Sequence, residues 1–389
     1  MKDRKKISLI LAVALIVITN IVTFNVAIIG HSAVSENKYV KLRFLEEFVK
    51  ENYLYPVTDE DLEAGELKGV IAGLDDPYSM YMTKDEFQEA TEDITGRFHG
   101  IGVYISAGED GLITVISPVK GSPADKAGIE AGDKIISIDG KDYTADKIND
   151  AVNSMKGEEG TEVDIKLLRP SNNKVFDVTI KREEIKDPTI ISDKIGDLGY
   201  IGITQFKNET GADFKNALGE LEAQNVKGLI VDLRGNGGGN VETAVEVADA
   251  LLPEGVIVYA KNKDGDIVFD YNSDSNQTEL PIVVLINEYS ASASEILAGA
   301  IQDHGRGTIV GMNSFGKGIG QSQKQFANGD GIRLTTFEYF LPKGENIHNI
   351  GIKPDVEVEL PDDIEGIGIE YSEVDLQLQK AIEILSNRE

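Results

Sequence analysis

Cysteine is absent from this sequence of 389 residues, and basic residues are scarce. Without cysteine the chain can form neither disulfide bonds nor zinc–thiolate sites, and it cannot use a thiol nucleophile. The 38 Lys and Arg are outnumbered by 67 Asp and Glu, which gives a formal net charge of −29. Binding to phosphates needs a concentrated basic surface, so we expect no nucleic acid partner. We interpret the acidity as a contribution to solubility.

Histidine is also rare, which limits the chemistry further. The chain has four histidines: His31, His99, His304 and His348. None follows a predicted buried strand, so a Ser-His-Asp triad is less favoured than a serine paired with a lysine. No H-E-x-x-H motif occurs, and the glycine-rich stretch 235–239 lacks the G-K-[ST] ending of a P-loop. We therefore predict neither a metal site nor a cofactor.

The N-terminus combines a basic flank with a long apolar run. The run extends from about residue 7 to residue 30 without a charge, after Lys2, Arg4, Lys5 and Lys6. It is long enough to cross a hydrocarbon layer of ~30 Å, and the basic flank favours the cytoplasmic side. A cleaved signal peptide is the alternative, but its apolar region is normally shorter and no clear A-x-A site follows. We predict an anchor in residues 1–34 that places the rest of the chain outside the cytoplasm.

The length predicts two or three domains, and changes of pattern place their boundaries. Residues 35–95 show apolar residues near the 3.6 period, which predicts a helical arm that packs on the body or forms a homodimer. Residues 96–182 are short β runs punctuated by glycine, a module of ordinary small-domain size. In residues 183–389, apolar runs such as 198–203, 228–233 and 281–286 alternate with predicted helices. This alternation is typical of an α/β layer domain.

A serine-rich loop follows the apolar run 281–286 and opens a predicted helix. A hydroxyl at a strand-to-helix turn, such as that of Ser292, is exposed beside free amides and the positive end of the helix dipole. These are the ingredients of an oxyanion hole. Ser292 and Glu295 also fit a capping box, in which the serine merely caps the helix. Taken alone, the loop favours the cap.

A lysine further along the chain changes this balance. Lys317 lies between Gly316 and Gly318, after Phe315, in a weakly charged stretch. A lysine held in a tight apolar turn loses solvation, so its pKa should fall toward neutrality and it can act as a base for a serine hydroxyl. The alternative is an exposed lysine in a glycine-rich hairpin. Together, Ser292 and Lys317 predict a serine nucleophile with a lysine general base.

Residues 96–182 resemble a PDZ domain. The similarity is carried by residues 100–103 (GIGV), 122–124 (SPA), 127–129 (AGI) and 132–136 (GDKII). A glycine-rich turn exposes amides to a terminal carboxylate, and the edge of the next strand can pair with a peptide backbone. The candidate peptide-binding residues are His99, Gly100, Ile101 and Gly102.

The stretch from about residue 70 to residue 360 resembles the carboxyl-terminal processing peptidases, also called tail-specific proteases. Six ordered segments carry the resemblance: 74–79 (LDDPYS), 98–103 (FHGIGV), 232–236 (DLRGN), 290–295 (SASASE), 315–321 (FGKGIGQ) and 351–355 (GIKPD). Three positions depart from the family. Gly237 replaces a usual Pro, Tyr289 a usual Gly, and Gly320 a common Val. None of these removes a reacting group.

The resemblance implies roles for individual residues. Ser292 would be the nucleophile, Lys317 the base, and Gln321 the group that orients the lysine. The oxyanion amides would be those of Ala293 and of a glycine in the run 237–239.

Among those glycines the resemblance favours Gly238. In the family the PDZ domain binds the C-terminal tail of the substrate and can gate the active site, and a coupling arginine of that domain maps to Arg169. We count Arg169 with the candidate peptide-binding residues.

The sequence therefore predicts an α/β peptidase core with an inserted PDZ-like domain, a helical N-terminal arm and one transmembrane helix. The expected protein is a membrane-anchored serine endopeptidase of the bacterial cell envelope that recognises protein tails. A catalytically silent PDZ scaffold at the membrane is the alternative, but it would need no Ser292, Lys317 or Gln321. The sequence does not name the substrate.

Overall fold

The computed structural model describes Thr19 and residues 37–387, apart from residues 96, 109, 187 and 362–363. The transmembrane helix predicted within residues 7–30 lies, Thr19 excepted, outside the described residues. Among the residues that are described, no helix is both long and apolar enough to cross a membrane. The chain divides into two units, Met1–Pro77 and Tyr78–Glu389.

The described part of the first unit contains the helices α2 (Lys38–Asn52) and α3 (Asp59–Ala72). The Thr58 side chain accepts a hydrogen bond from the Asp61 amide (3.1 Å) and begins α3 with a capping box. Three of the apolar side chains of α2 that suggested a packing face, those of Phe44, Leu45 and Phe48, are more than half exposed. Part of the apolar surface of α2, including Leu45 and Phe48, is therefore exposed.

A six-stranded sheet forms the centre of the second unit. Its strands follow the order β10 (Ile190–Ile195), β11 (Leu198–Ile203), β12 (Leu229–Asp232), β15 (Ile282–Ile286), β16 (Gly307–Gly311) and β19 (Val356–Glu357). All neighbours are parallel except β10 and β11. The three apolar runs predicted as strands are thus β11, β12 and β15. The sequence pattern predicted this α/β arrangement correctly.

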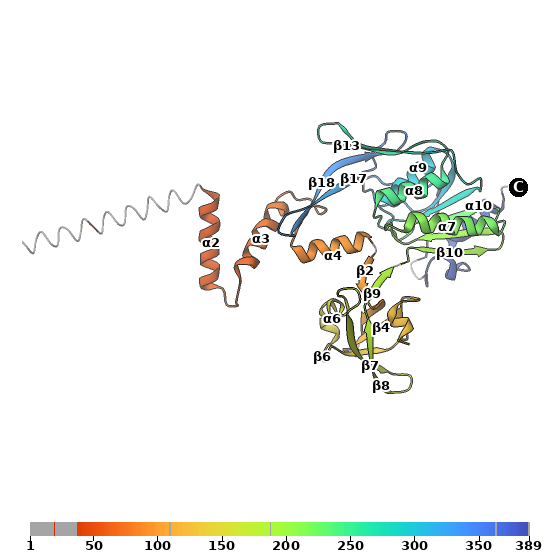
Figure 1. The fold of residues 1–389 in the computed structure, drawn as a ribbon. Helices are drawn as coiled ribbons and strands as arrows, with labels where there is room; N and C mark the ends of the chain where they lie inside the picture. The colour runs from red at the N-terminus through yellow and green to blue at the C-terminus, as the bar shows by residue number, and fades with distance from the viewer. Residues whose placement is uncertain are drawn as a thin grey trace, which may run out of the picture. The chain divides into compact units, whose positions relative to one another are not determined.

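Helices cover both faces of this sheet, which is why its strands read as continuous apolar runs. Alternate strand residues such as Val231 and Val284 share a core with α7 (Thr210–Ala223), α8 (Val241–Leu251) and α9 (Ala293–Asp303). The other strand residues, such as Ile230 and Val283, pack on α10 (Leu376–Ser386). Figure 1 shows α7 and α8 side by side over the sheet.

A second sheet carries the lysine loop, residues 314–318, which contains Lys317 and leads into β17. Its strands are β1 (Met80–Met82), β18 (Gly331–Phe340), β13 (Gly255–Asn262) and β14 (Ile267–Ser273), and β17 (Ile319–Gln325) pairs with β18. Strand β1 lies inside the stretch predicted as a helical arm, before α4 (Lys84–Thr95). Three residues are too few to show an alternating pattern, so their pairing with β18 was not visible in the sequence.

The PDZ-like module contains a sheet, two short α-helices and its own core. The sheet has the order β3 (Val103–Ala107), β4 (Ile113–Pro118), β5 (Lys134–Ile138), β7 (Glu162–Arg169) and β8 (Lys174–Lys181), and β6 (Lys141–Asp142) pairs with β5. The helices are α5 (Pro123–Lys126) and α6 (Ile148–Met155), the latter after a 3₁₀ turn.

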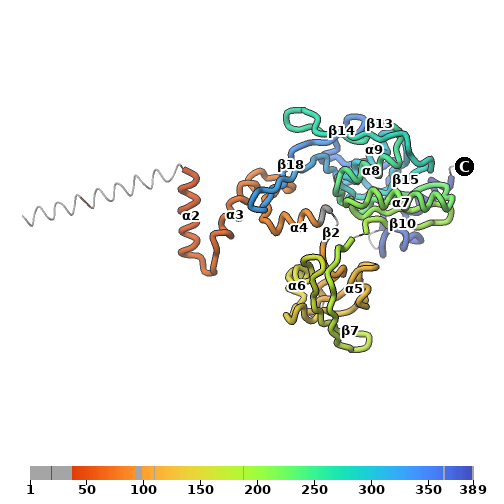
Figure 2. The backbone as a smooth tube through the Cα atoms, viewed as in Figure 1, coloured from red at the N-terminus to blue at the C-terminus, as the bar shows by residue number. Residues whose placement is uncertain are grey.

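Two paired strands join this module to the rest of the unit. Strand β2 (Arg97–Gly100) leads into it and β9 (Glu183–Lys186) leads out, and the two form an antiparallel ladder. Figure 2 traces this insertion between α4 and the central sheet.

Candidate active site

Ser292 lies at the point where the chain turns from β15 into α9. Its backbone has φ 55° and ψ −113°, a conformation that non-glycine residues rarely adopt. Its neighbours Ser290 and Ser294 are fully buried, and their hydroxyls donate to the carbonyls of Leu233 (2.8 Å) and Asn236 (2.9 Å). Ser292 is only partly buried. Of the three serines, it is the one that the fold leaves partly accessible.

The carboxylate of Glu295 connects the serine turn with the lysine loop. Its Oε2 accepts hydrogen bonds from the amides of both Ser292 (2.8 Å) and Lys317 (2.9 Å). Its Oε1 accepts from the Gly316 amide (2.7 Å) and the Ser314 hydroxyl (2.5 Å). Glu295 is 1% exposed, so these bonds lie in a medium where they are strong. The Glu295 half of the capping box is thus present, whereas the Ser292 side chain makes no cap hydrogen bond, so this contact holds the serine turn without using the hydroxyl.

Tyr339 on β18 makes a second connection between the same two segments. Its hydroxyl donates to the carbonyls of Ser292 (3.3 Å) and Lys317. Burial and the nearby Glu295 carboxylate raise the pKa of Tyr339, so the hydroxyl keeps its proton. The main chains of Ser292 and Lys317 are therefore tied together twice, at their amides and at their carbonyls.

Lys317 sits in the tight glycine turn that the sequence predicted. Gly316 has φ 90°, and a Cβ there would come within 2.9 Å of the Ile350 amide nitrogen. The lysine Nζ lies 4.4 Å from the centroid of the Tyr78 ring. Gln321, on β17, donates from Nε2 to the Thr335 hydroxyl (3.2 Å).

The predicted oxyanion residues lie beside Ser292. A Cβ on Gly238 would be 2.9 Å from the Cβ of Ser292 and 3.0 Å from the Ala293 nitrogen, and its φ is 101°. Only glycine fits this position without strain. Ala293 is the first residue of α9, where amides lack an acceptor within the helix. The Gly238 amide donates to Oδ1 of Asn236 (2.8 Å), so the choice among glycines 237–239 stays a prediction.

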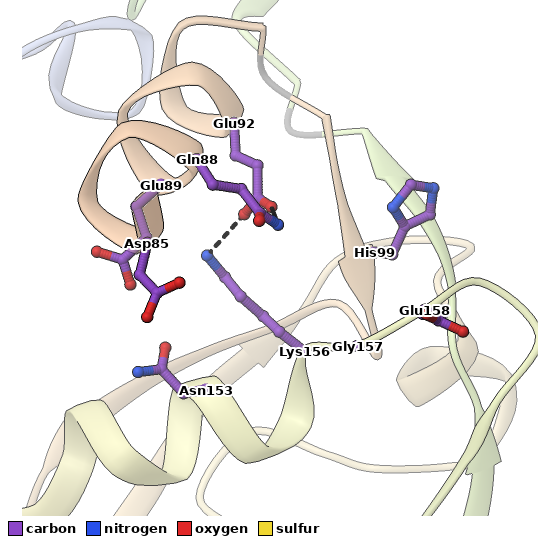
Figure 3. Close-up of a pocket in the computed structure, with 9 residues that line it drawn as sticks. All are labelled: Asp85, Gln88, Glu89, Glu92, His99, Asn153, Lys156, Gly157 and Glu158. Carbon is purple, nitrogen blue, oxygen red and sulfur yellow. Dashed lines mark hydrogen bonds and ion pairs between the residues drawn. The ribbon is translucent and has the colours of Figure 1, made fainter. Parts of the chain in front are cut away.

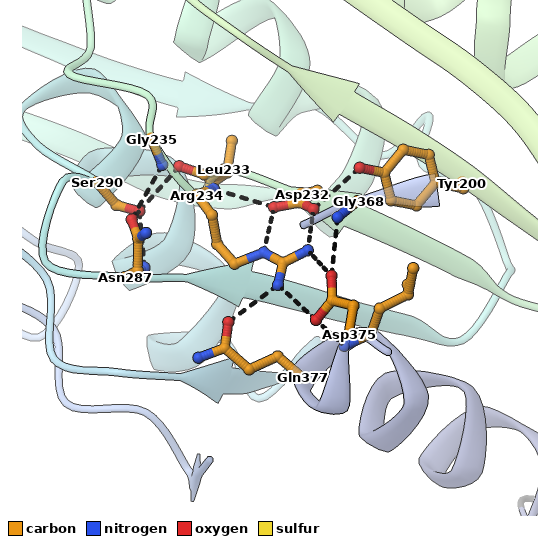
Figure 4. Close-up of polar contacts among 11 residues, drawn as sticks. Tyr200, Asp232, Leu233, Arg234, Gly235, Asn287, Ser290, Gly368, Asp375 and Gln377 are labelled. Atoms are coloured by element: carbon orange, nitrogen blue, oxygen red, sulfur yellow. Dashed lines mark hydrogen bonds and ion pairs between the residues drawn. The ribbon is translucent and has the colours of Figure 1, made fainter. Parts of the chain in front are cut away.

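A buried ion network anchors the loop that carries these glycines (Figure 4). The Arg234 side chain is fully buried and bonds to Asp232 (2.6 and 2.9 Å), Asp375 (2.7 and 2.9 Å) and Gln377 (2.9 Å). Tyr200 donates to Asp232 (2.9 Å). Asp375 also caps α10 through the Leu378 amide. The network thus joins the strand end before the glycine loop to the C-terminal helix.

This network predicts sensitivity to acid. Burial would raise the pKa of Asp375, but the Arg234 guanidinium overrides it and lowers that pKa. A lowered folded-state pKa stabilises the protein above the unfolded value of ~3.9, and that contribution is lost as the pH falls through the folded value. We expect Asp375→Asn to melt at a lower temperature than the wild type at pH 7. On acidification to pH 3, the melting temperature of the variant should fall by less than that of the wild type. Glu373→Gln, at an exposed carboxylate nearby, is the control; equal pH slopes for all three proteins would contradict this role.

The predicted peptide-binding residues divide between two cavities. Gly100, Ile101 and Gly102 line a cavity of about 130 Å³ between β3 and α6, with Val152 of α6 on its wall. His99 lines instead a cavity of about 510 Å³ shared with α4 (Figure 3).

Arg169 lies at neither cavity. It bonds to Asp133 (2.8 Å), Glu130 (2.8 Å) and the Gly128 carbonyl (2.7 Å), contacts that hold the PDZ-like module together. Its coupling to the peptidase stays a prediction.

Sequence reasoning missed three contributors to the site. Glu295 was visible only as a helix cap. Tyr78 was visible only as part of the segment LDDPYS, and Tyr339 gave no signal. The backbone of His348 also lies nearer to the lysine turn than the sequence suggested, because a Cβ on Gly318 would be 2.5 Å from the His348 amide nitrogen. Among the described residues, no group of three or more His, Asp or Glu could hold a metal ion.

Comparison with known proteins gives consistent matches. Family models match residues 197–358 (peptidase family S41), 114–169 (PDZ domain) and 27–86 (activating protease CtpB N-terminal domain). The carboxy-terminal processing protease CtpA of Bacillus subtilis is 37% identical over 92% of this chain and 77% of its own length. A carboxy-terminal-processing protease of Bartonella bacilliformis is 38% identical over 88% and 81%. A solved structure described as an S41 protease of Bacteroides fragilis has a similar fold (TM-score 0.50, 15% identity, 88% of this chain, 97% of the other).

Proposed function

Since the chain belongs to peptidase family S41 and is a carboxy-terminal processing serine protease with a PDZ domain, we propose that Ser292 and Lys317 form its catalytic dyad. The observation that carries this proposal is the shared hydrogen bond acceptor, Oε2 of Glu295, which binds the amides of both residues. A buried carboxylate with this bonding holds two loops in one arrangement. A tail-binding scaffold without activity would have no use for it.

The proposed reaction is an acyl transfer through the serine. Lys317 takes the proton from the Ser292 hydroxyl, and the serine oxygen attacks the carbonyl of the scissile bond. The amides of Ala293 and of a glycine in the run 237–239 hold the oxyanion. Lys317 then gives the proton to the leaving amine, and water hydrolyses the acyl-enzyme by the same steps. Gln321, on β17, keeps the lysine oriented.

The cavity between β3 and α6, which we call the groove, is the proposed tail site. It combines the glycine turn 100–102 with a strand edge and an apolar helix wall, the arrangement in which PDZ domains pair with a peptide strand and capture its carboxylate. The enzyme then prefers chains that end in a free, apolar C-terminus.

We expect the full chain to cleave a peptide with a free apolar C-terminus at least ~10-fold faster at low concentration than its C-terminal amide. Val152→Glu places a charge on the apolar wall and should remove most of this preference. Val175→Glu is a matched control, because Val175 is exposed on β8 and does not line the groove. Equal cleavage of acid and amide by the wild type would refute tail selection.

The location and assembly proposals rest on the N-terminal part. The basic flank and uncharged run of residues 2–30 support a single-pass anchor with the peptidase outside the cytoplasm. The exposed apolar residues of α2, Leu45 and Phe48, support a homodimer. Digestion by protease added to intact cells checks the first proposal, and light scattering checks the second.

A further inference from the structure

The ring of Tyr78 lies under the amine of Lys317. The Nζ-to-centroid distance of 4.4 Å is within the range of a cation–π contact. Tyr78 belongs to the segment LDDPYS, whose function is not explained by the nucleophile, the base or the oxyanion amides. We propose that Tyr78 is a positioning residue for the general base, and that its ring stabilises the ammonium formed when Lys317 takes the Ser292 proton. This inference rests on the proposed Ser292–Lys317 dyad.

The contact acts differently on the two protonation states of the lysine. The negative face of an aromatic ring attracts an ammonium, but it has little attraction for a neutral amine. The ring therefore stabilises the state after proton transfer more than the state before it, which is the condition for accelerating a step. A carboxylate stabilises the imidazolium of a Ser-His-Asp triad in the same sense. A ring attracts the cation less strongly than a carboxylate would, so the lysine can still lose its proton and serve as a base.

The fold fixes Tyr78 to the hairpin that carries the lysine. Its neighbour Ser79 is buried and accepts a hydrogen bond from the Thr335 amide (3.0 Å). The Thr335 hydroxyl in turn accepts from Gln321 (3.2 Å). Directly after Ser79, β1 pairs with β18, with Met80 opposite Arg333. The segment that presents the ring is thus bonded to β18. The same strand bonds to the Lys317 carbonyl through Tyr339 and to Gln321 through Thr335.

The proton balance involves no chemistry on the ring. One proton moves from Oγ of Ser292 to Nζ of Lys317 as the oxygen attacks, and then from Nζ to the leaving amine. The phenol neither gives nor takes a proton. The proposal therefore separates the ring, which is needed, from the hydroxyl, which is not.

The test measures kcat and KM of the full chain against pH with a tail peptide, for Tyr78→Phe, Tyr78→Leu, Ser292→Ala and Lys317→Ala. Tyr78→Phe keeps the ring and should match the wild type. Tyr78→Leu should lower kcat roughly 2- to 30-fold with an unchanged KM. It should also shift the midpoint of the rising limb of kcat to lower pH, because the ammonium loses its partner.

A series of fluorinated phenylalanines at position 78 covers the case in which Tyr78→Leu fails to fold. Fluorine keeps the shape of the ring but weakens its negative face, so kcat should fall stepwise with the number of fluorine atoms while the melting temperature holds. A flat series, or an equal loss in Tyr78→Phe and Tyr78→Leu, would overturn the role of the ring. If Ser292→Ala and Lys317→Ala were inactive in the same experiment, the Ser292–Lys317 dyad would still be supported. An active Lys317→Ala would instead overturn the dyad itself.

Discussion

Replacement of Ser292 or Lys317 by alanine is expected to lower kcat/KM at least ~10³-fold, with binding of tail peptides unchanged. Without the hydroxyl there is no acyl-enzyme, and without the amine nothing removes the serine proton. Because the two side chains act as one unit, the double variant should be about as inactive as either single one. Cleavage of a tail peptide measures the first effect, and fluorescence anisotropy of a labelled tail measures the second.

The neighbouring serines provide matched controls. Ser290→Ala and Ser294→Ala each remove a buried hydroxyl that donates to a carbonyl of the adjacent loop. Each should cost ~1 kcal/mol of stability or more while much of the activity persists. Normal turnover by Ser292→Ala would refute the nucleophile. Normal turnover by Lys317→Ala would refute the lysine base and make His348, whose backbone packs on Gly318, the next candidate for the general base.

Glu295→Gln is expected to lower kcat by ~10²-fold or more and to reduce stability by ~2–4 kcal/mol. The carboxylate accepts four hydrogen bonds, and the amide of glutamine would turn a donor toward two of these donors. The amides of Ser292 and Lys317 would then lose their common acceptor, and a small displacement between nucleophile and base costs much of the rate.

The measurement is kcat together with thermal melting at pH 7. Glu288→Gln removes an exposed carboxylate of the loop that precedes α9 and should change neither quantity. A Glu295→Gln enzyme that melts early but turns over normally would show that the carboxylate serves stability alone.

Local patterns and recognisable motifs predicted part of the fold and of the candidate site. The strands β11, β12 and β15 were predictable because burial on both faces leaves uninterrupted apolar runs. The turn at Ser292 was predictable as a strand end before a helix. The contacts of Glu295 with the lysine loop were not, because capping explained Glu295 locally and its other partners lie some 20 residues away. The resemblance assigns Arg169 a coupling to the peptidase; the bonds of its side chain to Asp133 and Glu130 lie within its own module, and the coupling stays a prediction.

The β2–β9 ladder has a consequence for how such an enzyme can change. The PDZ-like module leaves the main body at residues 97–100 and rejoins it at residues 183–186, and these two points are hydrogen-bonded to each other. A different recognition module whose ends also lie side by side could therefore be transplanted there without stretching the chain on either side. Under the proposed roles, target choice and bond cleavage belong to separate parts of the chain, so exchange of the module is expected to redirect this protease without a change to its catalytic residues.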